Sequence, residues 1–571
     1  MPKKQSLLKQ LNKLIKSAED ELQTKGWTSQ WEDIRDNLLP DRGPQIGTED
    51  SSKVNDGRKK RQNILTSVAE RSVANLAAGL KSYLTTPSRP WFQLKLKDTV
   101  LNENWEVKNW LDRQTAAMHR VMNKSNFYDS IHNLYIELAG FGSAVMIILE
   151  DEIDTINCKA LTCGEYYFNI GRKGTVNRLI RKTYMQVDNM VAEFGLDNVS
   201  ADVKDQYERN EGDKRHWVYH YIGPNDGQLN ATPPSILVSP GVVAPPQFLS
   251  IYWMKEGEKE LSVSGFAEWP VVPPRWNVIS NNIYGTECPG MVELGNIQMV
   301  YDMLNDELTG VKKVIDPPLI SDGNVDIIDT IPGGVSEGTG SVGQKQSLSA
   351  LYNVQFDIAS VDAVIEKYKE EIRTGFFNNL FLMLSADEND RKTAFEVARL
   401  QEEKMSMLGP MIERLNTSAL DIAIDRIWAI MDRQGLIEPV PEIAANVEMD
   451  IEYISLLAQA QKTSSLRSID SLLDFMSRAA QFAPEAIAAL PDWSEMTEIY
   501  RDGSGAPQRV LKSPTVLQTE REAAAAAAQR QQGMEMAGQL AAGAKDLSQA
   551  KLGENSALDA VLAGGAENLE Q

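Results

Sequence analysis

The sequence has few cysteines and no pattern that would join them. Only three of the 571 residues are cysteine, Cys158, Cys163 and Cys288. They form no CxxC pair and no cluster with metal-ligand spacing. We therefore expect free structural thiols in a reducing compartment.

Long hydrophobic runs are also missing. No apolar run reaches the ~18 residues that a membrane-spanning helix needs. The N-terminus reads MPKKQSLLKQLNKLIK, which has early lysines but no long apolar core and no cleavage site. This pattern indicates the start of an amphipathic basic helix rather than a signal peptide. The sequence therefore predicts no membrane association and a chain that is cytoplasmic at synthesis.

The motifs of common enzyme chemistry are absent as well. The sequence contains neither the phosphate-binding pattern GxxxxGK[ST] nor the nucleophile pattern GxSxG. Residues 338–343 read GTGSVG, a formal match to the dinucleotide pattern GxGxxG. That pattern needs a buried strand before it and a helix opening on it, and neither is indicated here. We predict a flexible loop and no nucleotide site.

Candidate metal ligands are scarce and scattered. His216 and His220 would share one face of a strand, but no carboxylate or cysteine stands near them at ligand spacing. Two aspartate pairs could also be imagined as ligands: Asp326 with Asp329, and Asp387 with Asp390. Exposed acidic loops are the commoner reason for such pairs. The sequence therefore predicts no catalytic residue, no cofactor and no metal.

Basic residues are outnumbered, 58 against 80 acidic ones, which gives a formal net charge of −22. This balance argues against a protein whose main task is to grip nucleic acid, because such proteins usually carry a basic domain or stripe. It does not exclude a protein through which nucleic acid passes. The basic clusters, Lys3, Lys4, Lys9, Lys13 and Lys16 and then residues 58–61, could contact phosphates, although a solvated surface is the more frequent explanation.

The apolar spacing predicts helices at both ends of the chain and strands between them. The length suggests roughly three or four domains. Residues 141–275 consist of short β-branched and aromatic runs and predict a strand-rich module with one helix near 187–194. Helical spacing predicts further helices at 3–22, 63–84, 105–122, 127–139, 284–314, 360–384 and 394–434.

Several single residues refine these boundaries. Thr286 is a plausible N-cap, and Pro289 suits the first turn of the helix that follows it. Pro410 should kink the helix at 394–434, and Gly435 should end it. Short helices are expected from Pro439 to Pro491. The alanine-rich tail from Ser513 should either form a helix that docks on neighbours or remain disordered.

A small hydrophilic island, SADENDRKT at 385–393, lies between two of the predicted long helices. Other marked stretches are LAAGLKSYLTTPSRPWFQL at 76–94, DPPLISDG at 316–323, PGGV at 332–335 and TAFEVARLQEEKMSMLGPMIERL at 393–415. In this order, and over most of the chain, they resemble the head-to-tail connector (portal) family of short-tailed (podovirus-type) tailed bacteriophages.

The resemblance implies an α+β, mostly helical subunit of a portal-type ring with wing, two-helix stem, small clip and helical crown. Mapped onto this chain, it implies an N-terminal arm (1–60), a wing (61–283), a first stem helix (284–315), a clip (316–359), a second stem helix (360–384), a channel or tunnel loop (385–393), a kinked wing helix (394–436), a crown (437–512) and an alanine-rich barrel helix or disordered tail (513–571).

The resemblance also implies a function. It implies a ring of about twelve copies at one capsid vertex, through which double-stranded DNA enters during packaging and leaves during ejection. It implies that scaffolding and capsid proteins, the terminase packaging motor and later the tail adaptor proteins bind the ring. The protein would reside in the virion and, during assembly, in the host cytoplasm. No enzymatic activity is expected.

Two sets of residues would carry this function. The channel loop would include Ser385, Asp387, Glu388, Asn389, Asp390, Arg391 and Lys392. The docking surface of the clip would include Asp316, Pro317, Pro318, Gly333 and Gly334. Mixed charges suit a channel loop, because a strongly basic lumen would bind the DNA backbone and hold it still.

Two other functions remain open from the sequence. One is a metal-dependent nucleic-acid-processing enzyme that uses the acidic loops. The other is a monomeric helical scaffold for other proteins.

Overall fold

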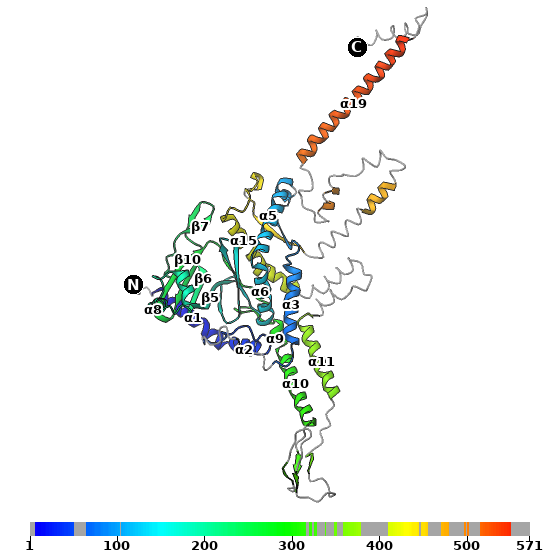
Figure 1. Ribbon diagram of the computed structural model, residues 1–571. Coiled ribbons are helices and arrows are strands. Elements are labelled where there is room, and N and C mark those ends of the chain that lie inside the picture. The colour runs from blue at the N-terminus through cyan, green and yellow to red at the C-terminus, as the bar shows by residue number, and fades with distance from the viewer. Residues whose placement is uncertain are drawn as a thin grey trace, which may run out of the picture.

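Helices and strands form one body, from which two projections extend in different directions (Figure 1). The computed structural model describes residues 6–48, 50, 57, 64–102, 104–315, 319–321, 325–327, 337–338, 348–350, 358–378, 409–444, 447–454, 470–478, 496–497, 499–501 and 514–549. One projection is the helix pair α10 (Leu294–Ile315) and α11 (Ile358–Gly375), and the other is α19 (Pro514–Gln549). The fold is α+β, as the sequence predicts.

The first part of the chain is helical where its apolar spacing predicts helices. Asn104 caps one of these helices, because its side chain accepts hydrogen bonds from the N–H groups of Glu106 and Val107. Helices α3 and α6 pack against each other in the body. The six helices are α1 (Leu7–Thr24), α2 (Trp27–Asn37), α3 (Val68–Leu84), α4 (Thr99–Asn102), α5 (Trp105–Lys124) and α6 (Phe127–Phe141).

The strand-rich module is confirmed. Its largest sheet is antiparallel with the order β10-β9-β6-β5-β4, and a smaller sheet has the order β11-β2-β3. A separate hairpin, β7 with β8, leaves the module between β6 and β9. The strands are β2 (Val145–Asp151), β3 (Thr155–Leu161), β4 (Tyr166–Ile170), β5 (Val176–Gln186), β6 (Arg215–Pro224), β7 (Ile236–Ser239), β8 (Val242–Ala244), β9 (Phe248–Met254), β10 (Lys259–Phe266) and β11 (Val271–Val272).

The module holds two helices, although the sequence predicts one. Helix α7 (Val187–Phe194) is the predicted one. Helix α8 (Ala201–Glu208) escapes prediction because it buries only Val203 and so has no apolar stripe. Its one visible signal is Ser200, whose side chain accepts a hydrogen bond from the N–H of Val203.

All three cysteines are buried and free. Burial raises the pKa of the Cys158 thiol to about 12 and that of Cys288 to about 12. Burial also raises the pKa of Cys163 well above its ordinary value. These thiols therefore act as small core residues, as the sequence indicates.

A strand from the C-terminal part returns to the body. Strand β16 (Met449–Tyr453) pairs antiparallel with β1 (Phe92–Leu96), so that Phe92 lies opposite Tyr453. The prediction of short helices from Pro439 onward is therefore wrong for this segment, although residues 470–478 are helical. The strand is stabilised by a partner more than 350 residues away in sequence, which local patterns do not reveal.

The helix predicted at 394–434 is interrupted in its described part. It consists of α14 (Gly409–Leu415), a π-helical turn (Asn416–Leu420) and α15 (Asp421–Arg433). The residues before Pro410 lie outside the described part of the chain, so the predicted kink at Pro410 is not tested. The end at Gly435 is confirmed, because this glycine has a φ of 68° and Leu436 N–H donates to the carbonyl of Met431.

Candidate channel and docking elements

Helices α10 and α11 form the projection that the sequence predicts as a stem. A proline at the first position of the short helix α9 (Pro289–Val292) precedes α10. The predicted N-cap at Thr286 is wrong, because the N-cap position of α9 is Cys288 and α10 begins only at Leu294. The backbone N–H of Thr286 instead donates to the carbonyl of Asn277, which ties the preceding loop together.

Burial along the stem changes from one end to the other. Near the body, Ile297 of α10 and Ile372 of α11 are 1% exposed. Farther out, the two helices expose apolar side chains to solvent: Leu308 is 51% exposed, Ile315 is 77% exposed and Val364 is 44% exposed. A single copy therefore leaves apolar surface of both helices in water.

The second stem helix ends earlier than the sequence predicts. Helix α11 stops at Gly375, and Phe377 adopts a left-handed conformation with a φ of 57°. Residues 379–384, which were predicted to continue the helix, lie outside the described part of the chain. A Cβ atom on Gly375 would lie 2.1 Å from Oε1 of Glu293, so the glycine permits the end of α11 to lie close to the residue that precedes α10.

The end of α11 is anchored in the body. Phe376 is fully buried, and the Asn378 side chain donates to the hydroxyl of Ser72 on α3 at 2.8 Å. Burial raises the pKa of the Glu293 carboxyl, which accepts a hydrogen bond from Asn296. These contacts fix the position of the stem relative to the body.

The segment between the stem helices contains short antiparallel strand pairs. Strand β12 (Leu319–Ser321) pairs with β15 (Leu348–Ala350), and β13 (Val325–Ile327) pairs with β14 (Glu337–Gly338). The described residues of this segment are therefore strands. The predicted docking residues, Asp316, Pro317, Pro318, Gly333 and Gly334, lie outside the described part of the chain.

The predicted channel loop also lies outside the described residues. This applies to Ser385, Asp387, Glu388, Asn389, Asp390, Arg391 and Lys392. The described elements on either side are the end of α11 in the body and α14, which begins at Gly409.

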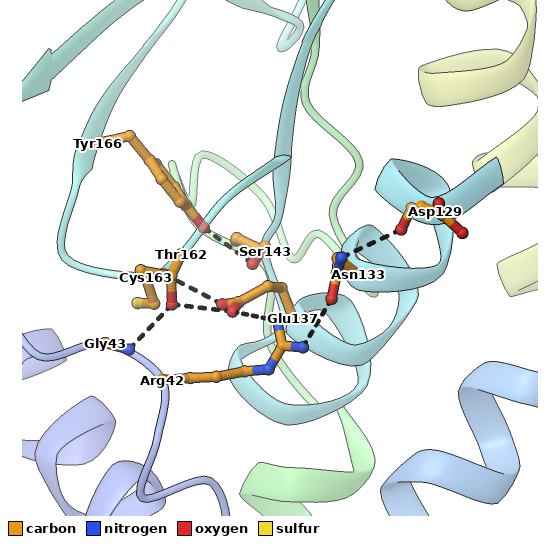
Figure 2. A network of polar contacts seen from close by, with 9 residues as sticks. All are labelled: Arg42, Gly43, Asp129, Asn133, Glu137, Ser143, Thr162, Cys163 and Tyr166. Atoms are coloured by element: carbon orange, nitrogen blue, oxygen red, sulfur yellow. Dashed lines mark hydrogen bonds and ion pairs between the residues drawn. The ribbon is translucent and has the colours of Figure 1, made fainter. Parts of the chain in front are cut away.

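A buried polar network holds the body behind the stem together (Figure 2). The Glu137 carboxylate on α6 accepts hydrogen bonds from Arg42 at 2.9 Å, from the Thr162 hydroxyl at 2.9 Å and from the N–H of Cys163 at 3.1 Å. Arg42 also donates to Asn133, one turn earlier on α6. The network therefore joins the segment after α2, helix α6 and the end of β3.

Sequence reasoning missed this network because its parts are far apart in the chain. The available signal was an acidic residue among apolar ones in the stretch LYIELAGF at 134–141, where Glu137 lies. A carboxylate that is 1% exposed needs a cationic partner and hydrogen-bond donors. Nothing in the sequence identifies Arg42 as that partner.

The two histidines considered as metal ligands make separate contacts, while Asp329, Asp387 and Asp390 lie outside the described part of the chain. His220 stacks on Tyr252 with ring centroids 3.8 Å apart and contacts the hydroxyl of Ser250. Burial lowers the pKa of His220 well below its ordinary value. His216 instead contacts Gln206. Among the described residues, no group of three or more His, Cys, Asp or Glu side chains could hold a metal ion.

The basic residues near the N-terminus and the possibility of a membrane-spanning helix can also be compared with the described structure. The lysines of α1, Lys9, Lys13 and Lys16, are exposed, which agrees with either a solvated surface or a phosphate contact. Within the described part of the chain, no helix is both long and apolar enough to cross a membrane.

Comparison with known proteins assigns the class. A family model described as bacteriophage head to tail connecting protein matches residues 8–511. The chain therefore belongs to this family, and the resemblance inferred from the sequence is confirmed.

Individual relatives refine the class. The chain is 33% identical to the portal protein of Salmonella phage epsilon15 over 563 residues, which cover 98% of each chain. It is 31% identical to the probable portal protein of Bordetella phage BPP-1 over 505 residues, which cover 86% of this chain and 87% of the relative. A solved structure, the neck of an empty gene transfer agent (GTA) particle, aligns with a TM-score of 0.35 and 11% identity over 76% of this chain and 90% of that chain.

The function that follows is that of a phage portal. The chain is a ring-forming connector that contacts capsid and tail, and it is a virion component at the capsid vertex. Its role is structural.

Proposed function

We propose that about twelve copies form a closed ring around a channel for double-stranded DNA. The observation that carries this proposal is the apolar surface on the outer halves of α10 and α11. Leu308, Ile315 and Val364 are exposed in one copy, and adjacent copies would bury them. At a net charge of −22 each, copies repel one another, so such apolar contacts are needed to hold a ring together.

The parts of the subunit follow from this arrangement. The body from α3 to β11 and the helix α15 would form the wing, with residues 1–60 as an N-terminal arm whose helices α1 and α2 pack on the body. Helices α10 and α11 would form the stem, residues 316–359 the clip and residues 385–393 the channel loop. Because β16 belongs to a sheet of the body, the crown would lie within 454–512, a shorter range than the sequence predicts.

The clip would dock the terminase packaging motor first and the tail adaptor proteins later. Its short strands stand at the far end of a rigid helix pair (Figure 1), a position that favours docking. Scaffolding and capsid proteins would contact the body of the subunit, and assembly would take place in the host cytoplasm.

Replacing residues 333–343 by a Gly-Ser linker of equal length tests the clip assignment. The linker leaves α10 and α11 untouched, so rings should form with unchanged mass. Motor docking and tail attachment should be lost, as measured by co-sedimentation with the motor protein and by the fraction of heads that carry tails. Normal docking of both partners would show that the clip is misplaced.

The enzyme alternative is tested separately. We propose that the chain has no catalytic activity, in line with a structural portal. Purified protein should neither cleave DNA with Mg²⁺ or Mn²⁺ nor hydrolyse ATP. ATP turnover that disappears when Gly340 is replaced by a bulky residue would establish a nucleotide site instead.

A further inference from the structure

The hairpin β7–β8 lies in the middle of an unusually long stretch without charge. From Gly227 to Met254 the chain has no Asp, Glu, Lys or Arg, although charged residues make up 24% of the sequence. Exposed loops of soluble proteins normally carry charges. The absence of charge over this stretch points to a surface that is covered in the assembled protein.

The hairpin is held in one conformation at its turn and at its base. The turn contains Pro240 and then Gly241, whose φ is 77°, a combination that suits a tight turn. At the base, the N–H of Asn225 donates to the carbonyl of Gln247 at 2.8 Å, and the Asn225 side chain donates to the carbonyl of Pro246 at 3.0 Å. The hairpin is therefore ordered before any partner binds.

Apolar side chains of the hairpin point into solvent. Leu237 is 44% exposed, Val242 is 52% exposed and Val243 is 65% exposed. Figure 1 shows the hairpin projecting from the strand-rich module. Strand β7 lies against α15, and in the described part of the chain β8 pairs with β7 alone. The outer edge of β8 is therefore open.

The same module has a second open strand edge. At one end of the five-stranded sheet, α1 packs against β4. At the other end, β10 pairs with β9, and no other described strand pairs with it. From Leu261 to Phe266 this edge strand also lacks charged residues. Each copy therefore carries two different open strand edges, β8 and the part of β10 from Leu261 to Phe266, that have no charged residues.

We propose that the β7–β8 hairpin of one copy docks along β10 of the next copy. The inference rests on the ring proposed above, because only an assembly places a second copy beside the hairpin. An uncharged contact suits copies that each carry −22. Because the two edges differ, the contact is head-to-tail, the kind that generates a ring when its rotation closes.

Engineered cysteines test the contact directly. The side chains at positions 242 and 243 point to opposite faces of β8, so one variant is made for each face. Val242→Cys and Val243→Cys are each combined with Ser262→Cys on β10. The native cysteines are buried and do not compete. A disulfide needs Cα atoms within about 7 Å, so it forms only where the two strands lie side by side. Mild oxidation of assembled rings should therefore give a ladder of covalent multimers with at least one of the two cysteine pairs. Each single variant should give no ladder.

A charge on the edge provides an independent test. Val243→Lys should raise the protein concentration needed for half-maximal ring assembly at least tenfold, whereas the matched control Thr232→Lys, also exposed but outside both strands, should leave it unchanged. This contact would be overturned, and the ring itself left intact, if Val243→Lys formed rings normally and rings of both cysteine double variants gave no ladder. If such rings failed only to enter capsids, the hairpin would bind another protein. Absence of rings from the unaltered chain would instead contradict the proposed function.

Discussion

At the scale of single residues, Glu137 shows how one buried carboxylate can position several elements. Its carboxylate oxygens accept hydrogen bonds from Arg42, Thr162 and Cys163. The segment after α2, helix α6 and the end of β3 therefore meet at one side chain. Such a pair contributes little net stability compared with an apolar pair, but the loss of one partner is costly. Its role is therefore to specify one arrangement of these segments.

We expect Glu137→Leu to destabilise the body by about 3 kcal/mol, because it leaves the Arg42 guanidinium and the Cys163 N–H without their acceptor. Adding Arg42→Met should recover part of this loss, since no charge then lacks a partner. Hydrogen exchange of the α6 and β3 amides measures the effect locally. Glu448→Gln, which removes the exposed pair with Lys97, is the control and should leave exchange unchanged. If Glu137→Leu alone and Glu137→Leu combined with Arg42→Met lost equal protection from exchange, the account of Glu137 would be wrong.

Glu165 makes stability depend on pH. Burial, and to a smaller extent the nearby Glu137 carboxylate, raise the pKa of its carboxyl to about 7. The folded pKa lies above the unfolded one, so the stability associated with the protonated form is complete below pH ~4.5 and is lost as the pH rises through about 7. At pH 8 the folded protein must hold a negative charge in a partly buried position.

Glu165→Gln should therefore stabilise the protein at pH 8, by up to about 3 kcal/mol, and much less at pH 5. The difference in thermal midpoint between variant and unaltered protein, measured from pH 5 to pH 8, checks this. A difference that stays constant over this range would show that Glu165 does not change its protonation there.

At the scale of elements, apolar periodicity predicted the long helices well, but the sequence did not reveal which distant strands pair. The stem helices were predicted from apolar spacing, and Ile297 and Ile372 are buried where that spacing places them. Strand β16 was missed because it is only five residues long and its partner strand is distant in sequence. The early end of α11 at Gly375 was hidden by the apolar run that follows it.

The end of α15 offers an element-scale test of backbone conformation. Gly435→Ala should destabilise this helix end by about 1 kcal/mol, because alanine disfavours the left-handed conformation that Gly435 adopts. Among the described residues, no atom outside the neighbouring backbone lies within 4 Å of the added Cβ, so the expected effect is conformational. Gly409→Ala, also in open space but not at positive φ, is the matched control and should be neutral or slightly stabilising. Hydrogen exchange at the end of α15 distinguishes the two.

The proposed channel loop gives a functional test of another element. Replacing Ser385–Lys392 by a Gly-Ser linker should leave rings intact but reduce the DNA retained in filled heads, because exposed mixed charges add only ~0–1 kcal/mol per contact and act together around a ring. Changing Asp387, Glu388 and Asp390 to Lys should instead make packaging slow and salt-sensitive. Failure of the linker variant to form rings would make the loop a structural joint. Normal packaging and retention in both variants would remove the loop from the DNA path.

At the scale of the whole molecule, a single copy exposes apolar surface at two separate places. Leu308 and Ile315 of the stem and Val243 of the hairpin are exposed to solvent. In the proposed ring, a neighbouring copy would bury these side chains. The sequence could predict the family and the helices α10 and α11, because both depend on local motifs and periodicity. It could not predict which surfaces meet, because those depend on distant pairings such as β1 with β16.

The most direct test of the ring is the mass of the purified protein under native conditions. Measured by native mass spectrometry over a range of concentrations, salt and Mg²⁺, it should show one closed species of about twelve copies, with a central channel visible by electron microscopy. A protein that stays monomeric under all of these conditions would contradict the account.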